Sequence, residues 1–139
     1  MILPYAEELA RRLALPVMLV QVVSLSMPVT LGGETAYLWT AGVELEKRLD
    51  VFTTGYLSGI GRKMMENGIT ANWDVLHGRA AEAIVQRAKG DAATLIVMAT
   101  HGRSGLGRWR VGSVAEAVVR EAQVPVLLVP PRASCSESG

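Results

Sequence analysis

The sequence predicts an α/β domain built on a doubly wound, mainly parallel sheet with helices on both faces. Two observations carry this prediction. Short apolar runs rich in β-branched residues alternate with segments of helical periodicity, and such alternation is typical of parallel strands joined by right-handed crossovers. Half of the 139 residues are apolar, which is enough for one continuous core. We therefore expect a single domain over residues 1–131 and a flexible polar tail at 132–139.

The first half of the chain predicts two helices and one strand. Apolar residues recur at helical spacing in residues 4–13, and Pro16 ends that segment. The apolar, β-branched run 17–23 predicts a strand buried on both faces. Turn residues dominate 24–37, which predicts a long loop, and helical periodicity then runs from about 42 to 67.

In the second half of the chain, shorter predicted strands and helices alternate. We expect strands at 72–78, 93–100 and 124–130 and helices at 79–90 and 113–123. The chain therefore holds four predicted strands and opens on a helix, whereas this architecture ordinarily opens on a strand.

Composition and charge exclude several classes of partner. Fourteen basic and thirteen acidic residues give a net charge of +1, so we expect no general attraction to nucleic acid or to anionic lipid. No apolar stretch reaches the roughly 18 residues that span a bilayer, so no membrane partner is expected. The only cysteine, Cys135, permits no intramolecular disulfide, and we expect a cytoplasmic protein.

A segment rich in glycine and arginine, residues 102–112, joins the predicted strand 93–100 to the next helix. Ligands of open parallel sheets collect beyond the carboxyl ends of the strands. Glycines permit close backbone approach, and the free amides at a helix start favour an anion. Arg103, Arg108 and Arg110 are candidate phosphate contacts, although exposed loops also carry arginine for solvation alone.

The start of the helix at 113–123 also has a purely structural interpretation. Ser113 and Glu116 form an S-x-x-E pattern, which is typical of a capping box that satisfies the first amides. Taken alone, the glycines match neither the dinucleotide pattern nor the P-loop pattern. From this local pattern the phosphate site and the capping box both stay open.

The side chains that carry metal or catalytic chemistry are sparse. His77 and His101 belong to no metal-binding spacing, and Cys135 is remote from both. No nucleophile elbow surrounds Ser104 or Ser113, and no acid–base pair stands out. We expect no metal-ligand cluster and no dedicated catalytic residues.

The stretch MATHGRSGLGRWRVGSVAEAVVREAQVPVLLVPP resembles the C-terminal third of the universal stress protein family. Members that bind ATP show the pattern G-x2-G-x9-G-[ST]. Gly102, nine intervening residues, Gly112 and Ser113 match this pattern, while Ala99 replaces its first glycine. The stretches LPYAEELARRLALPVMLVQVV and HGRAAEAIVQRAKGDAATLIVMATHG are similar to earlier helices and strands of the family.

The resemblance implies an adenine nucleotide alpha hydrolase-like fold with an ATP site, and Mg²⁺ only where ATP is bound. The phosphates would lie against glycines of the pattern and the helix start, with the ribose or triphosphate beside the preceding strand and adenine at the early strand. Core packing is the alternative role for Val22 and Met98. The residues implied in nucleotide binding are Val22, Met98, Ala99, Gly102, Arg103, Gly112, Ser113 and Val114.

The resemblance also implies what is missing. Family members open with a strand of the form ILVPxDxS that lies at the centre of a five-stranded sheet, and this chain has no counterpart of it. Three explanations stay open: the natural protein starts upstream of Met1, the two neighbouring strands pair directly, or a segment of another copy takes the place of the strand.

Two functions follow from the resemblance. The first is a stress-response module that binds ATP and acts as a homodimer through the strand Val124–Val129, with at most slow hydrolysis. The second is a nucleotide-independent dimeric interaction protein of the same fold, which the alanine at position 99 and the missing strand favour.

Overall fold

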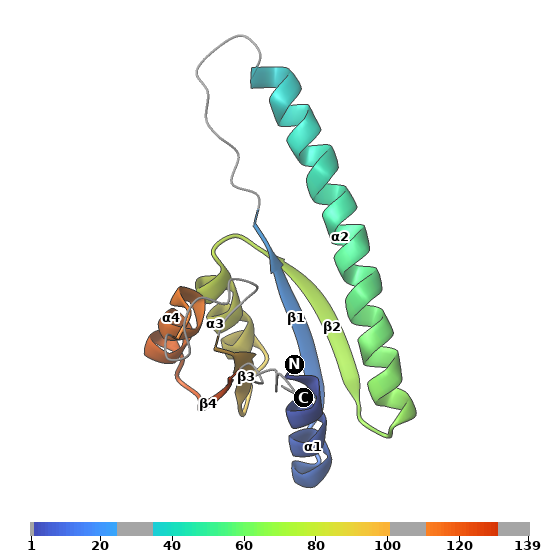
Figure 1. Cartoon of the computed structure of the whole chain (residues 1–139), viewed down its shortest axis with the longest axis vertical. Coiled ribbons are helices and arrows are strands. Elements are labelled where there is room, and N and C mark those ends of the chain that lie inside the picture. Colours follow the sequence, from blue (N-terminus) through green and yellow to red (C-terminus); the bar gives the residue numbers. More distant parts are fainter. Residues whose placement is uncertain (1, 25–34, 101–110, 131–139) are drawn as a thin grey trace, which may run out of the picture.

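The computed structural model describes residues 2–24, 35–100 and 111–130. It confirms the predicted α/β class, and each predicted helix and strand has a counterpart (Figure 1). The predicted tail at 132–139 lies outside the described residues. The elements in chain order are α1 (Leu3–Leu13), β1 (Val17–Val23), α2 (Thr35–Glu66), β2 (Ala71–His77), α3 (Ala80–Gly90), β3 (Ile96–Ala99), α4 (Ser113–Glu121) and β4 (Val126–Val129).

Helix α2 is longer than its sequence pattern predicts. It begins at Thr35 and runs for 32 residues, so the last part of the predicted loop is helical. The residues before Gly42 include alanine and leucine, which favour helix, but the glycine and the aromatic residues hide the periodicity. Figure 1 shows α2 extending past the end of the strands it covers. Within the part of the chain that the structure describes, no helix is long and apolar enough to cross a membrane.

The four described strands form two separate parallel pairs. β1 pairs with β2 from Val17 opposite Ala71 to Val23 opposite His77. β3 pairs with β4 from Ile96 opposite Val126 to Ala99 opposite Val129. The two pairs are not hydrogen-bonded to each other, so the described strands form no four-stranded sheet. Direct pairing of the two neighbours of the missing strand in one sheet is therefore wrong as an explanation for its absence.

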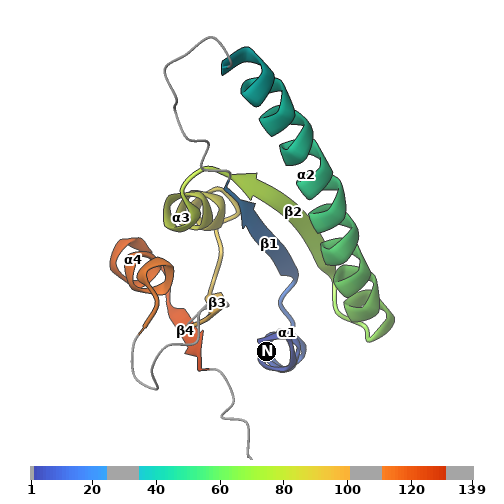
Figure 2. The same ribbon diagram turned by 45° about the horizontal axis from the view of Figure 1, so that its top comes forward.

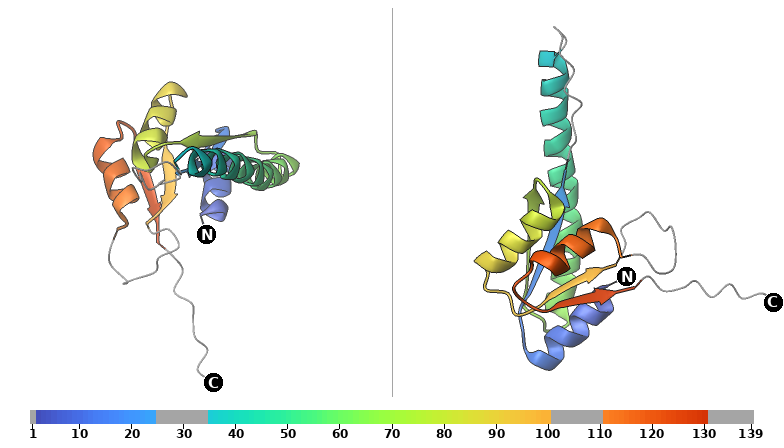
Figure 3. Two further views of the ribbon diagram at one scale, coloured as in Figure 1. Left: turned by 90° about the horizontal axis from the view of Figure 1, so that it is seen from above. Right: turned by 90° about the vertical axis from the view of Figure 1, so that its left-hand side faces the viewer.

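The helices lie in two layers around the strands. Figure 2 shows α3 and α4 together on one side of the strands and α1 and α2 on the other. This arrangement agrees with the predicted double winding. The two views of Figure 3, compared with Figure 1, show that the β3–β4 pair runs in a different direction from the β1–β2 pair. The carboxyl ends of β1 and β3 therefore diverge.

A small apolar cluster holds the β1–β2 pair to the first helix layer. Ala10 of α1, Met64 of α2, Ile69 and Ala71 are buried together, and Met64 has no exposed surface. Leu3, Val17, Leu19 and Ile60 pack around them. On the other pair, α4 buries Ala115 and Val118, and β4 buries Val129. Each strand pair thus has its own helix-covered core.

Arg87 of α3 links the second helix layer to the β1–β2 pair. Its Nη1 donates to Asp74 Oδ2 at 2.8 Å, and its Nε donates to Asp91 Oδ2 at 2.9 Å. Its Nη2 also approaches the sulfur of Met18 at 3.7 Å. Because the Arg87 side chain is about one-third exposed (32%), we expect these contacts to orient α3 more than to stabilise the fold.

Two glycines of α2 give a matched test of this packing. A Cβ at Gly61 would collide with Trp73, reaching 2.7 Å from its Cζ3 atom, whereas a Cβ at Gly59 would meet nothing within 4 Å. Gly61→Ala should lower the free energy of unfolding by about 1–3 kcal/mol through overpacking. Gly59→Ala should raise it by about 0.5–1 kcal/mol, because alanine favours helix over glycine. Urea denaturation measures both, and equal stabilisation by the two changes would contradict the packing of α2 on β2.

Candidate functional site

A backbone hydrogen bond, called the loop closure below, joins Thr100 at the end of β3 to Gly112 at the start of α4. The Gly112 N–H donates to the Thr100 carbonyl oxygen at 2.6 Å. The Thr100 N–H donates to the Val129 carbonyl oxygen at 3.1 Å, which continues the β3–β4 pairing by one residue. The start of α4 is therefore held at the carboxyl end of the β3–β4 pair. This is the position at which parallel sheets bind ligands.

The first turn of α4 has no side-chain cap. Its N-cap is Gly112, with φ −64° and ψ 154°, and Ser113 is the first helical residue. The Glu116 N–H donates to the Gly112 carbonyl oxygen at 2.9 Å, so the intrahelical ladder begins there. The capping-box interpretation is wrong, because Ser113 lies one position too late to act as the cap. The N-cap of α4 thus gives no side-chain hydrogen bond to the first amides, and the positive end of the helix dipole favours an anion at this position.

The structure brings several of the predicted site residues together. Met98 and Ala99 are half-buried at the end of β3, Gly112 is half-buried at the start of α4, and Ser113 and Val114 are exposed in its first turn. The backbone bond between Thr100 and Gly112 joins the two groups. Gly102 and Arg103, like Arg108 and Arg110, lie outside the described residues.

Val22 is not brought to this cluster by strand pairing. It is half-buried near the end of β1, where its register partner is Leu76 of β2. Ala99 pairs with Val129 in the other strand pair, and the two pairs are not hydrogen-bonded to each other. The intermediate burial of Val22 and Met98 is compatible with both core packing and ligand contact.

An imidazole–carboxylate contact at the end of β2 has no signal in the sequence. His77 Nε2 lies 2.8 Å and 3.0 Å from the two carboxylate oxygens of Asp50, and 3.9 Å from Glu46 Oε1. His77 comes from β2 and both acids come from α2, so only the packing of α2 on β2 reveals the contact. No group of three or more His, Cys, Asp or Glu residues able to hold a metal occurs among the described residues.

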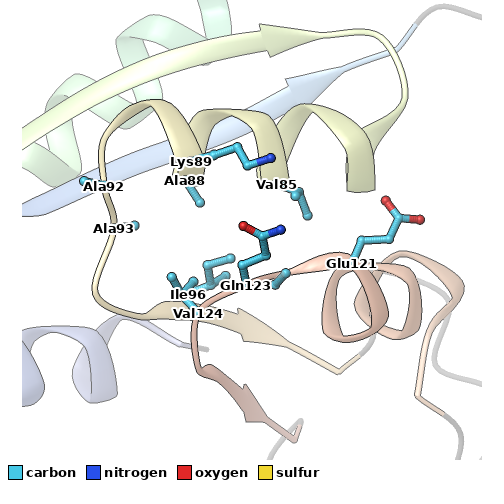
Figure 4. Close-up of a pocket in the computed structure, with 10 residues that line it drawn as sticks. Val85, Ala88, Lys89, Ala92, Ala93, Ile96, Glu121, Gln123 and Val124 are labelled. Atoms are coloured by element: carbon cyan, nitrogen blue, oxygen red, sulfur yellow. The ribbon is translucent and has the colours of Figure 1, made fainter.

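A pocket of about 220 Å³ lies between α3 and α4, away from the loop closure (Figure 4). Ile96 begins β3 and Val124 precedes β4, so the pocket opens at the amino ends of these strands. Phosphate-binding geometry in parallel sheets belongs to the opposite, carboxyl ends. The residues that line this pocket include Val85, Ala88, Lys89, Ile96, Glu121 and Val124.

Comparisons with known proteins point to one family. The model of the Universal stress protein family matches residues 2–130 of the chain. Universal stress protein MJ0531 of Methanocaldococcus jannaschii is 45% identical over 69 residues, which are 49% of this chain and 41% of that protein. The aligned stretch thus spans less than half the length of this relative.

Solved structures share the fold. Protein MJ0577 of Methanocaldococcus jannaschii superposes with a TM-score of 0.79 at 23% identity, covering 96% of this chain and 88% of that one. The universal stress protein from Archaeoglobus fulgidus in complex with dAMP superposes with a TM-score of 0.55 at 23% identity, covering 91% and 83%. At these identities the likeness concerns the fold alone.

The bond between Gly112 and Thr100 can be removed with little change in backbone shape. Proline fixes φ near −65°, which is close to the −64° of Gly112, but it has no N–H to donate. Gly112→Pro should therefore unfold with a free energy about 0.5–1.5 kcal/mol lower than that of Gly112→Ala, which keeps the donor. Urea denaturation of the two variants measures the difference. Equal stabilities would show that the loop closure does not depend on this hydrogen bond.

Proposed function

The chain belongs to the universal stress protein family, and from this premise we propose that it is a regulatory module that binds an adenine nucleotide, with ATP as the expected ligand. The observation that carries the proposal is the uncapped first turn of α4, held at the carboxyl end of β3 by the Gly112–Thr100 bond. Backbone amides and the helix dipole at such a turn favour a phosphate. The family relative from Archaeoglobus fulgidus, solved with dAMP, supports an adenine nucleotide as the ligand.

The proposed contacts follow the order of the family pattern. The amides at Ser113 and Val114 would bind phosphate oxygens, and Gly112 would let the phosphate approach the backbone closely. Gly102 and Arg103 would add loop contacts, while Met98 and Ala99 would lie beside the ribose or triphosphate. Val22 would line the adenine end only when the two strand pairs take up the required relative position.

Ala99 and Glu116 restrict how the nucleotide lies. Alanine in place of the first glycine of the pattern adds a methyl group where the backbone would otherwise approach the ligand. Glu116 lies in the first turn of α4, so its carboxylate disfavours a phosphate placed beside it. Mg²⁺ would accompany ATP through phosphate oxygens and water.

The expected activity is sensing rather than turnover. The described part of the site consists of the half-buried end of β3 and the first turn of α4, and the sequence offers no acid–base pair or nucleophile elbow for it. We expect at most slow hydrolysis of ATP, with nucleotide occupancy passed on through a homodimer. We place this activity in the cytoplasm, where a chain with a single cysteine needs no disulfide.

Nucleotide binding is tested first on the purified full chain. Denaturation should release an adenine nucleotide that chromatography and mass spectrometry identify, and calorimetric titration of the emptied protein with ATP and Mg²⁺ should saturate. Gly112→Val should weaken ATP binding by about tenfold or more, or about 1.4 kcal/mol, because its side chain fills the approach to the amides. Gly90→Ala is the matched control, since a Cβ there meets nothing within 4 Å and the residue ends α3, which precedes the amino end of β3 and not its carboxyl end.

Two outcomes would contradict the nucleotide proposal. A folded protein that neither carries nor binds adenine nucleotide lacks the site altogether. Equal loss of affinity in Gly112→Val and Gly90→Ala would mean that the loop closure does not hold the phosphates.

A nucleotide-independent dimer is the second candidate function, favoured by the outer edge of β4. The Ile96 N–H donates to the Pro125 carbonyl oxygen, so the alternation of a parallel pair turns the backbone groups of Val126 and Leu128 away from β3. No described strand pairs with this edge. An apolar strand with an open edge favours pairing with a second copy.

The β4 interface has a specific test. Leu128→Pro removes one outward N–H without removing a donor to β3, so a dimer formed by edge pairing should become a monomer in analytical ultracentrifugation. Circular dichroism of the variant checks that it stays folded. A folded variant that remains dimeric would place the interface elsewhere.

A further inference from the structure

The inference concerns one side of helix α2, called the α2 seam below. Its residues are Leu45, Leu49, Phe52, Tyr56, Gly59 and Lys63. We propose that the α2 seam binds the α2 seam of a second copy of this chain, with the two helices antiparallel. This surface lies on a different element from β4 and from the loop closure, so the inference goes beyond the proposed functions.

The spacing of the α2 seam is that of a helix–helix contact. Its residues follow one another at steps of four, three, four, three and four positions. Alternating steps of this kind average about 3.5 residues, so they keep one side of a helix facing a partner helix over several turns. Such a strict stripe is narrower than the apolar face of a helix that packs on a globular core. The pattern therefore indicates a helix as the partner.

The α2 seam is exposed, although four of its six residues are leucine or aromatic. Phe52 is 74% exposed, Tyr56 is 57% exposed and Leu45 is 49% exposed. Leu49 is half-buried. Single exposed apolar residues are ordinary, whereas a contiguous apolar stripe marks an interaction surface.

The core of the domain uses another side of the same helix. Thr53, Leu57 and Met64 are buried, and each follows a residue of the α2 seam by one position. One position rotates a helix by about 100°, so the α2 seam lies about a quarter turn away from the buried side. A second helix can therefore reach the α2 seam while α2 stays packed on β2. Figure 1 shows the first part of α2 extending past the strands.

An antiparallel pair brings complementary residues of the α2 seam together. With a two-fold axis at the level of residue 54, Phe52 lies opposite the partner's Tyr56, and Leu49 lies opposite the partner's Gly59. A Cβ at Gly59 would meet nothing within 4 Å in the single chain, so this position has room for a leucine side chain. One register thus matches two aromatic residues and pairs a large residue with a small one.

Charges favour the antiparallel over the parallel arrangement. In a parallel pair Lys63 would face the partner's Lys63, and like charges repel each other. In the antiparallel pair the partner's Lys63 lies at the level of Leu45, one residue from Glu44 along the axis. Arg48 and the partner's Arg62 also lie on this flank. Glu44 Oε1 accepts a hydrogen bond from Arg48 Nε at 3.3 Å, so its carboxylate offsets part of the repulsion among these cations.

The area of the α2 seam is sufficient for a specific dimer. An aromatic side chain buries about 150–250 Å² in full, so Phe52 and Tyr56 together would bury roughly 200–300 Å² per copy at their present exposure. The leucines of both copies add to this area. The total approaches the roughly 1,000 Å² of a small specific interface, so we expect a concentration-dependent dimer rather than a permanent one.

Two adjacent and equally exposed residues give the first test. Phe52 belongs to the α2 seam and is 74% exposed, whereas Val51 lies outside it and is 75% exposed. Phe52→Glu should weaken self-association of the full chain by about tenfold or more, because it places a carboxylate against the partner's Tyr56. Val51→Glu should associate like the unchanged chain. Analytical ultracentrifugation over a range of concentrations measures both, and circular dichroism checks that both variants are folded. A dimer formed through β4 contributes equally to both variants.

Disulfide cross-linking tests the orientation of the helices. Two chains are prepared with Cys135→Ser, which removes the only native cysteine, and each receives one new cysteine, by Leu45→Cys or by Lys63→Cys. In the antiparallel pair these two positions lie opposite each other, whereas two copies of either position lie about 27 Å apart along the axis. A glutathione redox buffer should therefore cross-link the mixture of the two chains and should cross-link neither chain with itself.

Two results would overturn the proposal. Equal self-association of the folded Phe52→Glu and Val51→Glu chains would show that the α2 seam is not an interface. Cross-links that form within each chain type, with none specific to the mixture, would show that the helices are not antiparallel. A chain that gives both expected results but binds no nucleotide would contradict the nucleotide proposal alone.

Discussion

The fold depends on how the backbone hydrogen bonds of parallel strands are distributed. A parallel strand presents donors and acceptors on both edges, and each of the four described strands uses one edge within its own pair. The apolar cluster around Met64 packs against the β1–β2 pair, and the buried residues of α4 belong to the unit that contains the β3–β4 pair. Helix α3 contacts β1 and β2 and packs against α4, which contacts β4, so the domain consists of two strand–helix units that α3 connects.

The two ends of the candidate nucleotide site depend on different parts of this arrangement. The proposed phosphate end would need only β3, β4 and α4, because the Gly112–Thr100 and Thr100–Val129 bonds hold the helix start at the strand end. The proposed adenine end would also need Val22 of β1, which belongs to the other pair. Affinity for phosphate groups and selectivity for the base would therefore have separate structural requirements.

Features that depend on a local sequence pattern were predictable, whereas features that depend on contacts between distant parts of the chain were not. The strand at Val17–Val23 was predictable because its apolar, β-branched run ends at a proline on one side and at turn residues on the other. An S-x-x-E pattern does not reveal which residue is the N-cap of the helix. In α4 the N-cap is Gly112, and Ser113 is already helical. Likewise, the Asp50–His77 contact joins two elements 27 residues apart. An apolar strand pattern indicates burial but does not identify the strands on either side.

The separation of the two strand pairs gives the two ends of the proposed site a thermodynamic connection. Val22 belongs to the β1–β2 pair and Ala99 to the β3–β4 pair, and both are among the predicted nucleotide contacts. A nucleotide that contacted both pairs would favour one relative position of them, whereas a ligand bound only through the phosphate end would contact one pair. Linkage requires that any change fixing this relative position alter the affinity for the nucleotide by the factor by which the nucleotide favours that position. Coupling would therefore come from contact with both pairs, which makes the base, rather than the phosphates, the part of the nucleotide that senses how the two pairs are arranged.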